Sequence, residues 1–421
     1  MPHVPQMSRP ADVSDIDLSD LAFWERPLKE RHKAFARLRR YDPLFFAEAD
    51  MGPVPIGPGY HALVRHADVV EASRTPLVFT SEPSAISIPD MPREFSEFFG
   101  SMINLDDPRH ARMRRIVSRG FTPRMLAKLD ADIQRVAARI IDDLLDTGPC
   151  DFVPAVSARL PLTIICEMMG IPEEQHRRVF DNSSIVLAGS DPDYLGNDPE
   201  TAVHRLLAAG GELAALLTEL AAERRRAPRQ DLTSALVSAD IDGDALTDQE
   251  IGSFFILLAV AGNETTRNAI SHALALLTRF PDQRDTWWSD FEAHAATAVE
   301  EIVRYASPIT WMRRTLSRDH EMNGTHYRAG DKVLLMYASA NRDSAVFTDP
   351  DRFDVTRSPN PHVGFGGPGP HFCLGAHLAR REITVMLREM HRRVPTIRAT
   401  SEPQRLLSNF VNGIKSLPCD F

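Results

Sequence analysis

The sequence has little of what disulfide-bonded or nucleic-acid-binding proteins need. Its 421 residues include only four cysteines, at positions 150, 166, 373 and 419, and their spacing suggests no pairing. Such a small, unpaired set is typical of a reducing compartment, so we expect a cytoplasmic protein. The formal net charge is −10, which argues against nucleic acid as the main partner.

Long apolar segments are also missing. The most apolar run, Phe254–Ala261, is far too short to cross a bilayer. The first twenty residues are polar and acidic and lack the basic-then-apolar design of a secretion signal. We therefore expect no membrane span, and we expect residues 1–18 to form a loose, flexible leader.

No dinucleotide-binding domain, flavin domain, internal repeat or domain linker is evident. By length alone the chain could be one large domain or two or three small ones.

What the sequence does have is a concentration of glycine and proline beside one cysteine. Five glycines and prolines lie between Phe365 and Cys373, and an apolar helical pattern follows Gly375. The sulfur should therefore lie near a helix start, where backbone N–H groups favour a thiolate. A single thiolate is a poor zinc site but a good axial ligand for haem iron. The plainer alternative is a buried cysteine in a turn.

The longest predicted helix covers residues 247–280. Thr247 and Glu250 form a capping box at its start, and Pro281 ends it. The helix is apolar nearly all round from Ile251 to Ala261, so we expect it to cross the core.

The segment 262–266, Gly-Asn-Glu-Thr-Thr, interrupts this apolar run. A glycine, an acid and two threonines are poor helix chemistry in a buried position, and such conflicts are expected at functional sites. The alternative is that Thr265 donates back to the carbonyl of Ala261 and merely bends the helix.

Two further spacings carry information. His110 and Arg114 are four apart on a predicted helix that starts near Asp106, so they share one face, which on its own could be a solvated basic surface. Glu301 and Arg304 form a Glu-x-x-Arg pair, which by itself is an ordinary surface ion pair.

Together these stretches resemble the cytochromes P-450, the haem-thiolate monooxygenases. The family's haem-binding loop is written Phe-x-x-Gly-x-(His or Arg)-x-Cys-x-Gly. Gly369, His371, Cys373 and Gly375 fall on this pattern, whereas Phe365 lies one residue too early, so the loop carries one extra residue. The resemblance runs from about residue 20 to the end of the chain.

The resemblance implies a role for each matching residue. Cys373 would bind the iron of haem b, Thr265 and Glu264 would deliver protons, and Glu301, Arg304 and Arg352 would form a structural triad. Arg314, five residues before Asp319, is favoured over Arg313 as a ligand of a haem propionate, although a shared role stays open. The other implied haem contacts are His110, Arg114, Ala261, Gly262, Phe365, Gly366, His371 and Gly375.

The implied fold is mainly α: a single cytochrome P-450 domain over residues 19–421, a helical prism with small β-sheet regions, and a monomer. The implied partners are O2 and a ferredoxin with its NAD(P)H-dependent reductase. We expect the ferredoxin to dock on a basic surface formed by Arg109, Arg112, Arg115 and Arg119. The competing class is a haem protein that is not an oxygenase, such as a gas sensor, a ligand carrier or a peroxide- or nitric-oxide-using relative. The intact Glu264-Thr265 pair argues against it.

The expected substrate is an apolar, lipid-like chain. Val260, Ala261 and Ile309 are small or β-branched and uncharged, and Trp311 follows closely. The blocks around these residues, and the extra residue in the haem loop, resemble the actinobacterial branch that oxidises methyl-branched fatty acids, isoprenoids and sterol side chains. We expect terminal hydroxylation of a methyl-branched lipid. The alternative is a bulky sterol or polyketide, which would need a wider mouth formed by residues 75–101.

Overall fold

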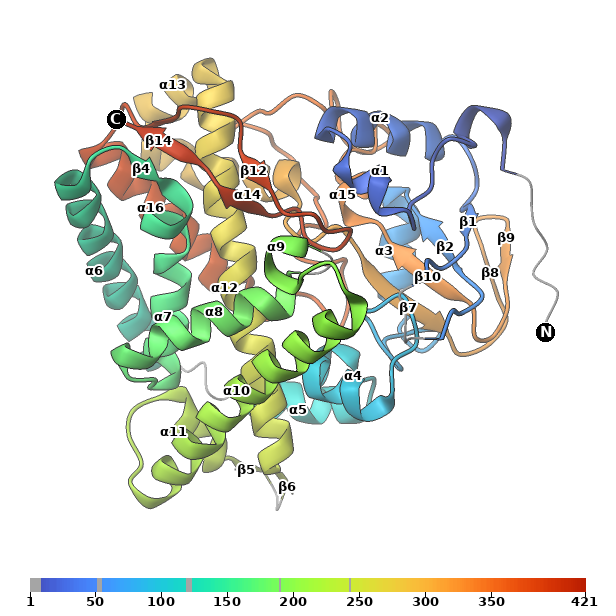
Figure 1. Ribbon diagram of the computed structural model, residues 1–421. Coiled ribbons are helices and arrows are strands. Elements are labelled where there is room, and N and C mark those ends of the chain that lie inside the picture. The colour runs from blue at the N-terminus through green and yellow to red at the C-terminus, as the bar shows by residue number, and fades with distance from the viewer. Residues whose placement is uncertain (1–8, 51–54, 119–122, 189–190, 242–243) are drawn as a thin grey trace.

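The computed structural model describes residues 9–50, 55–118, 123–188, 191–241 and 244–421. Helices make up most of this part of the chain, and the larger sheet lies to one side of them, as expected (Figure 1). No helix in these ranges is long and apolar enough to cross a membrane.

The long helix α12 (Asp248–Arg279) crosses the middle of the helical layer (Figure 1). Its start has the predicted capping box between Thr247 and Glu250, and Pro281 follows its last turn. Because α12 is apolar on most sides, it packs against neighbours all round: α4 (Arg93–Gly100), α7 (Arg159–Met169), α8 (His176–Leu187), α10 (Pro199–Arg226), α14 (Phe291–Ala306) and α16 (Ala376–Arg393).

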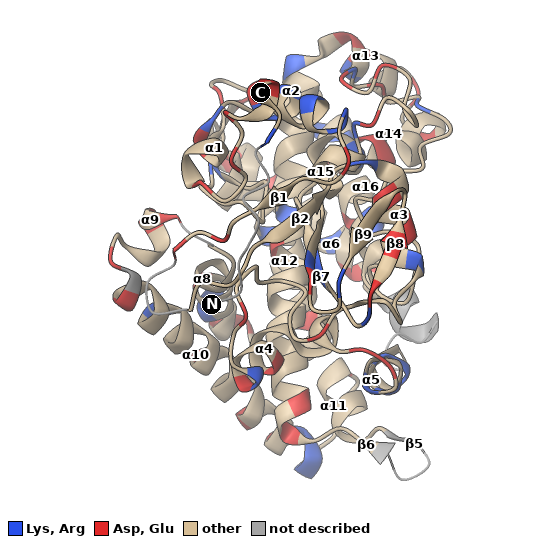
Figure 2. Ribbon diagram, turned by 90° about the vertical axis from the view of Figure 1, so that its right-hand side faces the viewer, with Lys and Arg blue, Asp and Glu red and all other residues tan. Residues whose placement is uncertain are grey.

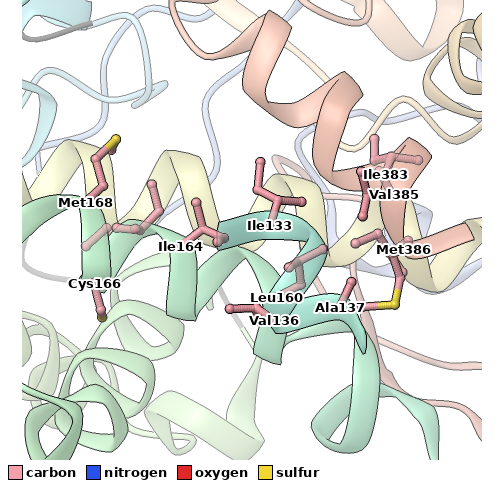
Figure 3. Packing of buried hydrophobic residues seen from close by; sticks show 14 of the residues in the cluster. Ile133, Val136, Ala137, Leu160, Ile164, Cys166, Met168, Ile383, Val385 and Met386 are labelled. Carbon is pink, nitrogen blue, oxygen red and sulfur yellow. The ribbon is translucent and has the colours of Figure 1, made fainter. Parts of the chain in front are cut away.

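The main apolar core lies where α7 and α16 meet α6 (Pro123–Thr147), beside α12. The side chains of α6, α7 and α16 meet there in close packing (Figure 3). Cys166 belongs to this core, as expected, and burial raises the pKa of its thiol. This core fixes α12 and α16, the two helices nearest the predicted haem site.

The larger sheet has five strands: β1 (Phe45–Phe46), β2 (Tyr60–Leu63), β10 (Lys332–Leu335), β7 (Met312–Leu316) and β3 (Phe79–Thr80), side by side in that order. β2 and β10 run parallel, and the other neighbours are antiparallel. Successive side chains of a strand point to opposite faces, so Arg313 and Arg314 of β7 lie on different faces of this sheet.

The remaining elements are short or peripheral. The helices are α1 (Leu21–Glu25), α2 (Leu28–Leu38), α3 (His66–Arg74), α5 (Arg109–Ser118), α9 (Pro192–Leu195), α11 (Leu232–Val237), α13 (Pro281–Ser289) and α15 (Tyr337–Ala340), with 3-10 turns at Ala11–Val13, Ser101–Asn104 and Glu173–Gln175 and a π-helical turn at Val153–Ser157. The strands are β4 (Cys150–Asp151), β5 (Asp240–Ile241), β6 (Asp244–Ala245), β8 (His320–Met322), β9 (Thr325–Tyr327), β11 (Arg398–Ala399), β12 (Gln404–Arg405), β13 (Ile414–Ser416) and β14 (Pro418–Asp420).

The N-terminal region differs from its prediction. Residues 1–8 of the expected leader lie outside the described residues, but Val13, Ile16 and Leu18 are buried in an apolar cluster, so this part of the leader is packed. The apolar spacing from about Leu18 to Arg40 predicts an amphipathic helix after an irregular start, but the structure has two helices there, α1 and α2. Pro27 separates them, because a proline forces the residue before it, Arg26, into an extended conformation.

Candidate active site

The glycine-rich loop before α16 is held in turns that other residues would strain. Gly366 and Gly369 have positive φ angles of +89° and +155°. A Cβ on Gly369 would lie 2.3 Å from the carbonyl oxygen of Ser73, so only glycine lets the loop approach α3 this closely. The backbone N–H of Cys373 donates to the carbonyl of Phe365 at 3.0 Å. The loop therefore presents the cysteine immediately before α16.

Cys373 is surrounded by many protein atoms, yet it is exposed to solvent. Burial raises the pKa of the thiol, while the backbone N–H of Gly375 and the charges of Arg114 and Arg380 act in the opposite direction. A group that is enclosed by protein and still accessible faces a hollow. The sulfur has the predicted place near a helix start, within a cationic surrounding.

The middle of α12 shows the same combination of depth and access. Ala261 is exposed, and Gly262 and Thr265 are half-buried, although most of the helix around them is buried. The hydroxyl of Thr265 donates to the carbonyl of Ala261 at 2.7 Å, which is the back-bond considered from the sequence. The helix nevertheless continues through this point, so one face of α12 borders open space at these small residues.

Glu264 points into a buried polar cluster. Its carboxylate forms an ion pair with Arg267 at 2.7 Å and accepts a hydrogen bond from the hydroxyl of Ser184 at 3.1 Å. Both charged side chains are almost fully buried. Glu264, the acid next to Thr265, is therefore a buried carboxylate whose ion-pair partner, Arg267, lies one helix turn further along α12.

Near the cysteine loop, imidazole and guanidinium groups gather, and the carboxylate of Asp107 lies 3.4 Å from the Nδ1 of His110. The rings of His110 and His371 lie 4.1 Å apart, and His371 shares a hydrogen bond of 3.0 Å with Ser81. The Nε2 atom of His110 is buried and has no partner among the described residues. Burial, with Arg314 next, lowers the pKa of His371 to about 2.

Two arginines complete this group. Arg114 donates to the carbonyls of Pro370 and Phe372 at 2.9 and 2.8 Å, so it grips the cysteine loop directly. Arg314 is buried, its pKa is lowered by that burial, and its guanidinium donates to the carbonyl of Arg313. A cavity of about 380 Å³ lies beside His110 and Arg114, between α5 and the loop, and Asp107 also lines it. An unpartnered imidazole nitrogen and two cations suit the carboxylate groups of a large cofactor.

Phe365 and the predicted triad complete the loop's support, with one correction. Phe365 packs on the core, and the guanidinium of Arg380 lies 4.3 Å from its ring. Glu301 and Arg304 are paired at 2.7 Å and buried, but the third arginine is Arg357, not Arg352: its Nε lies 3.2 Å from Glu301.

Arg352 cannot fill that place, because its side chain is 62% exposed and pairs with Asp354. It contributes only its carbonyl, which accepts from Arg304 and Arg357. Nothing in the sequence spacing distinguished the two arginines.

The predicted substrate residues are less closely grouped than expected. Val260 belongs to the main core, Ile309 packs against the cluster around Phe79, and Trp311 belongs to the cluster that includes Phe46. The Trp311 ring packs edge-on against Phe410, with centroids 4.9 Å apart. The described contacts do not bring these three side chains together.

Comparison with known proteins decides the family. The cytochrome P450 family model matches residues 295–404. The methyl-branched lipid omega-hydroxylase of Mycobacterium tuberculosis is 50% identical over 410 residues, covering 96% of this chain and 94% of that protein. The chain belongs to the cytochrome P450 family. The steroid C26-monooxygenase of Mycolicibacterium smegmatis is 38% identical over 423 residues, covering 99% and 96%.

The fold agrees with that family. A cytochrome P450 of Mycobacterium marinum in complex with pseudoionone superposes with a TM-score of 0.91 at 42% identity, covering 99% of this chain and 100% of that one. The expected mainly α cytochrome P450 fold is confirmed. The family implies a cysteine-ligated haem, and the chain is a cytochrome P450 monooxygenase that uses O2 and redox partners to hydroxylate an apolar substrate. The accessible Cys373 and the orphaned His110 nitrogen fit that cofactor.

Proposed function

We propose that this cytochrome P450 hydroxylates methyl-branched lipids at the terminal carbon. The observation that carries the proposal is the 50% identity with the methyl-branched lipid omega-hydroxylase over almost the whole length of both chains. The second candidate is oxidation of a steroid, which relatives at 38% and 39% identity are named for. The higher identity favours the lipid.

In this proposal Cys373 supplies the iron ligand. The bound haem supplies the activation of O2 that lets one oxygen atom enter a C–H bond. The chain's task at the sulfur is to hold a thiolate despite burial, and the N–H of Gly375 with Arg114 and Arg380 favours that form. Cys373→Ser should therefore lose the red-shifted Soret band of the reduced, CO-bound protein; survival of the band would contradict the assignment.

His110, Arg114, Arg314 and His371 would hold the haem propionates, because they place cationic and imidazole donors together and the Nε2 of His110 has no partner among the described residues. Ala261 would leave room for the haem, since a larger side chain at this exposed point of α12 would fill it, and Gly262 lets α12 pack closely on Ile165, which a Cβ would approach to 2.8 Å. Phe365 and Gly366 would shape the cysteine loop.

Thr265 and Glu264 would govern protons. The Thr265 hydroxyl now donates to Ala261, so it must turn from that carbonyl to donate elsewhere. Glu264 lies next to it in sequence and is held by Arg267 and Ser184 away from bulk solvent. We propose that Glu264 relays protons: its carboxylate takes up a proton that enters from water and passes it on, which replaces the proton that Thr265 gives up.

Electrons would come from a ferredoxin and its NAD(P)H-dependent reductase, with the enzyme acting as a cytoplasmic monomer. Figure 2 shows basic residues along α5, where the docking surface was expected. Arg109 pairs with Glu97 at 2.9 Å and Arg112 with Glu250 at 2.7 Å, whereas Arg115 is exposed. Arg119 lies outside the described residues. An acidic partner would thus compete with the protein's own acids for two of these arginines.

The substrate assignment is tested by spectral titration and product analysis. Methyl-branched and straight-chain fatty acids of equal carbon number, and a sterol, are titrated into the haem-loaded protein, and turnover is run with ferredoxin, reductase and NAD(P)H. The proposal expects tighter binding of the branched acid and oxidation at its end. Tight binding of the sterol alone, or no preference for branches, would refute it.

A further inference from the structure

Two neighbouring arginines of β7 serve different parts of the molecule. Arg314 faces the histidine pair beside the cysteine loop. Arg313, only 1% exposed, extends from the other face of the sheet to a single segment. Its guanidinium donates to the carbonyl of Ile88 at 2.8 Å and to the carboxylate of Asp90 at 2.5 Å. The Arg313 guanidinium therefore binds the segment 84–92, whereas the carbonyl of Arg313 accepts a hydrogen bond from Arg314.

A second buried cation grips the same segment. Lys332 of β10, with its side chain 3% exposed, lies 3.1 Å from Asp90 and donates to the carbonyl of Ile88 at 3.2 Å. Lys332 pairs with Thr315 in the β7–β10 register, so its side chain lies on the same face as Arg313. Glu48 also forms an ion pair with Lys332, at 2.6 Å. Asp90 thus bridges two buried cations from adjacent strands.

The segment held in this way lies between the cysteine loop and α4. Just before it, Ser81 is hydrogen-bonded to His371 beside the cysteine loop. At Ala85 it joins the sheet, because the N–H of Arg313 donates to its carbonyl at 2.8 Å. It then continues into α4, which packs against α12, and whose Phe98 and Phe99 lie against α10 at Gly210. Residues 81–100 therefore connect the cysteine loop with α12 and α10, and we call this stretch the wall.

We infer that Asp90 is a positioning residue that fixes this wall and with it the fit of the lipid chain. The inference rests on the proposed function, since it explains how that site would select a chain end. The Asp90 side chain is 57% exposed, but it is the carboxylate that both Arg313 and Lys332 contact. Without it Lys332 keeps Glu48 and Arg313 keeps the carbonyl of Ile88, so the loss falls mainly on the fixed place of the segment.

Asp90→Asn is the test, with Asp143→Asn as the matched control. Asp143 is similarly exposed and pairs with Arg159 at 2.6 Å, on α6 rather than at this wall. Both variants are loaded with haem, checked by the CO spectrum and titrated with a methyl-branched fatty acid and with pseudoionone. We expect Asp90→Asn to bind the branched acid about 3- to 10-fold more weakly and to give more product oxidised away from the chain end. Asp143→Asn should match the parent, and Asp90→Glu should recover most of the loss.

The outcomes separate the two proposals. Parental affinity and product distribution in Asp90→Asn would overturn the role of Asp90, provided that the parent binds the branched acid. If the parent binds pseudoionone but not the branched acid, the proposed substrate is wrong, and the role of Asp90 is then decided by the pseudoionone affinities. Equal losses in both variants, or no recovery in Asp90→Glu, would also overturn it.

Discussion

Two Glu-x-x-Arg pairs in this molecule have the same spacing and depth but different surroundings. Glu301 and Arg304 on α14, and Glu264 and Arg267 on α12, are each paired at 2.7 Å, with side chains almost inaccessible to solvent. Taking two charges out of water is costly unless their remaining donors and acceptors are satisfied. The two pairs meet this demand to different degrees.

The pair on α14 is saturated. Arg304 also donates to the carbonyls of Asn341 and Pro350 at 2.8 and 2.9 Å. Glu301 also accepts from the N–H of Asp354 at 2.9 Å and from Arg357. With that many bonds the pair joins α14 to the segment before the cysteine loop, and neither charge can leave without breaking several contacts.

The pair on α12 is sparsely held. Glu264 accepts one further hydrogen bond, from Ser184, while the Nε of Arg267 has no partner among the described residues. Next to it stands Thr265, at the accessible point of the helix. The same sequence spacing thus makes a many-bonded structural pair on α14 and a pair with few other partners, next to Thr265, on α12.

The largest expected effect distinguishes the ion pair on α14 from the ion pair on α12. Glu301→Gln should lower the free energy of unfolding by about 3–5 kcal/mol, because it strands two arginines. Little haem-loaded protein should then accumulate. Glu264→Gln should fold and bind haem, since fewer contacts depend on that carboxylate. Urea unfolding and the CO-difference spectrum measure both; equal losses in the two variants would erase the contrast.

The next prediction concerns which arginine joins the ion pair on α14. Arg357→Gln should cost about 2–3 kcal/mol, because Arg357 contacts Glu301 and also donates to the carbonyl of Thr348 at 2.8 Å. Arg352→Gln should cost about 0.5 kcal/mol or less, since that side chain is mostly exposed. A larger loss for Arg352 in urea unfolding would restore the arrangement expected from the sequence.

This arginine illustrates what the sequence could and could not predict. Helix α12 lies within one residue of its predicted bounds at each end, because caps, prolines and apolar periodicity are local signals. The cysteine loop was recognisable because glycine and proline constrain the backbone directly. The choice between Arg352 and Arg357 depends on how a loop folds back onto α14, which no local signal records.

The same limit applies to the wall near the substrate. The sequence pointed to residues 75–101 only as the mouth that a bulky substrate would need, and it favoured Arg314 over Arg313 by spacing from Asp319. It gave no sign that Arg313 would meet Asp90, because that contact joins residues 223 positions apart. Likewise it gave no sign that the ring of Trp311 would pack on Phe410.

A smaller effect is expected at Thr265, which lies next to the ion pair on α12. Thr265→Ala should bind haem and substrate but convert about tenfold less of the consumed NAD(P)H into product, with the rest appearing as peroxide. Thr286→Ala is the control, because Thr286 makes the same back-bond, to Asp282 at 2.8 Å, on α13. Equal coupling of NAD(P)H to product in Thr265→Ala and the parent would contradict the role of Thr265.

The smallest expected effect tests whether the sparse pair on α12 is functional rather than merely less well packed. Ser184→Ala removes the one hydroxyl that donates to Glu264, at 3.1 Å, and should cost about 1 kcal/mol of unfolding free energy. Ser183→Ala is the matched control: it removes a neighbouring buried hydroxyl, which donates to the carbonyl of Phe180 at 3.1 Å, and should cost about the same. If Glu264 resupplies protons, its position matters, so only Ser184→Ala should raise the share of electrons lost to peroxide, by about twofold. An equal rise in both variants would mean that loosened packing is the cause. No rise in either would leave Glu264 as a buried structural acid and would assign oxygen use to Thr265 alone.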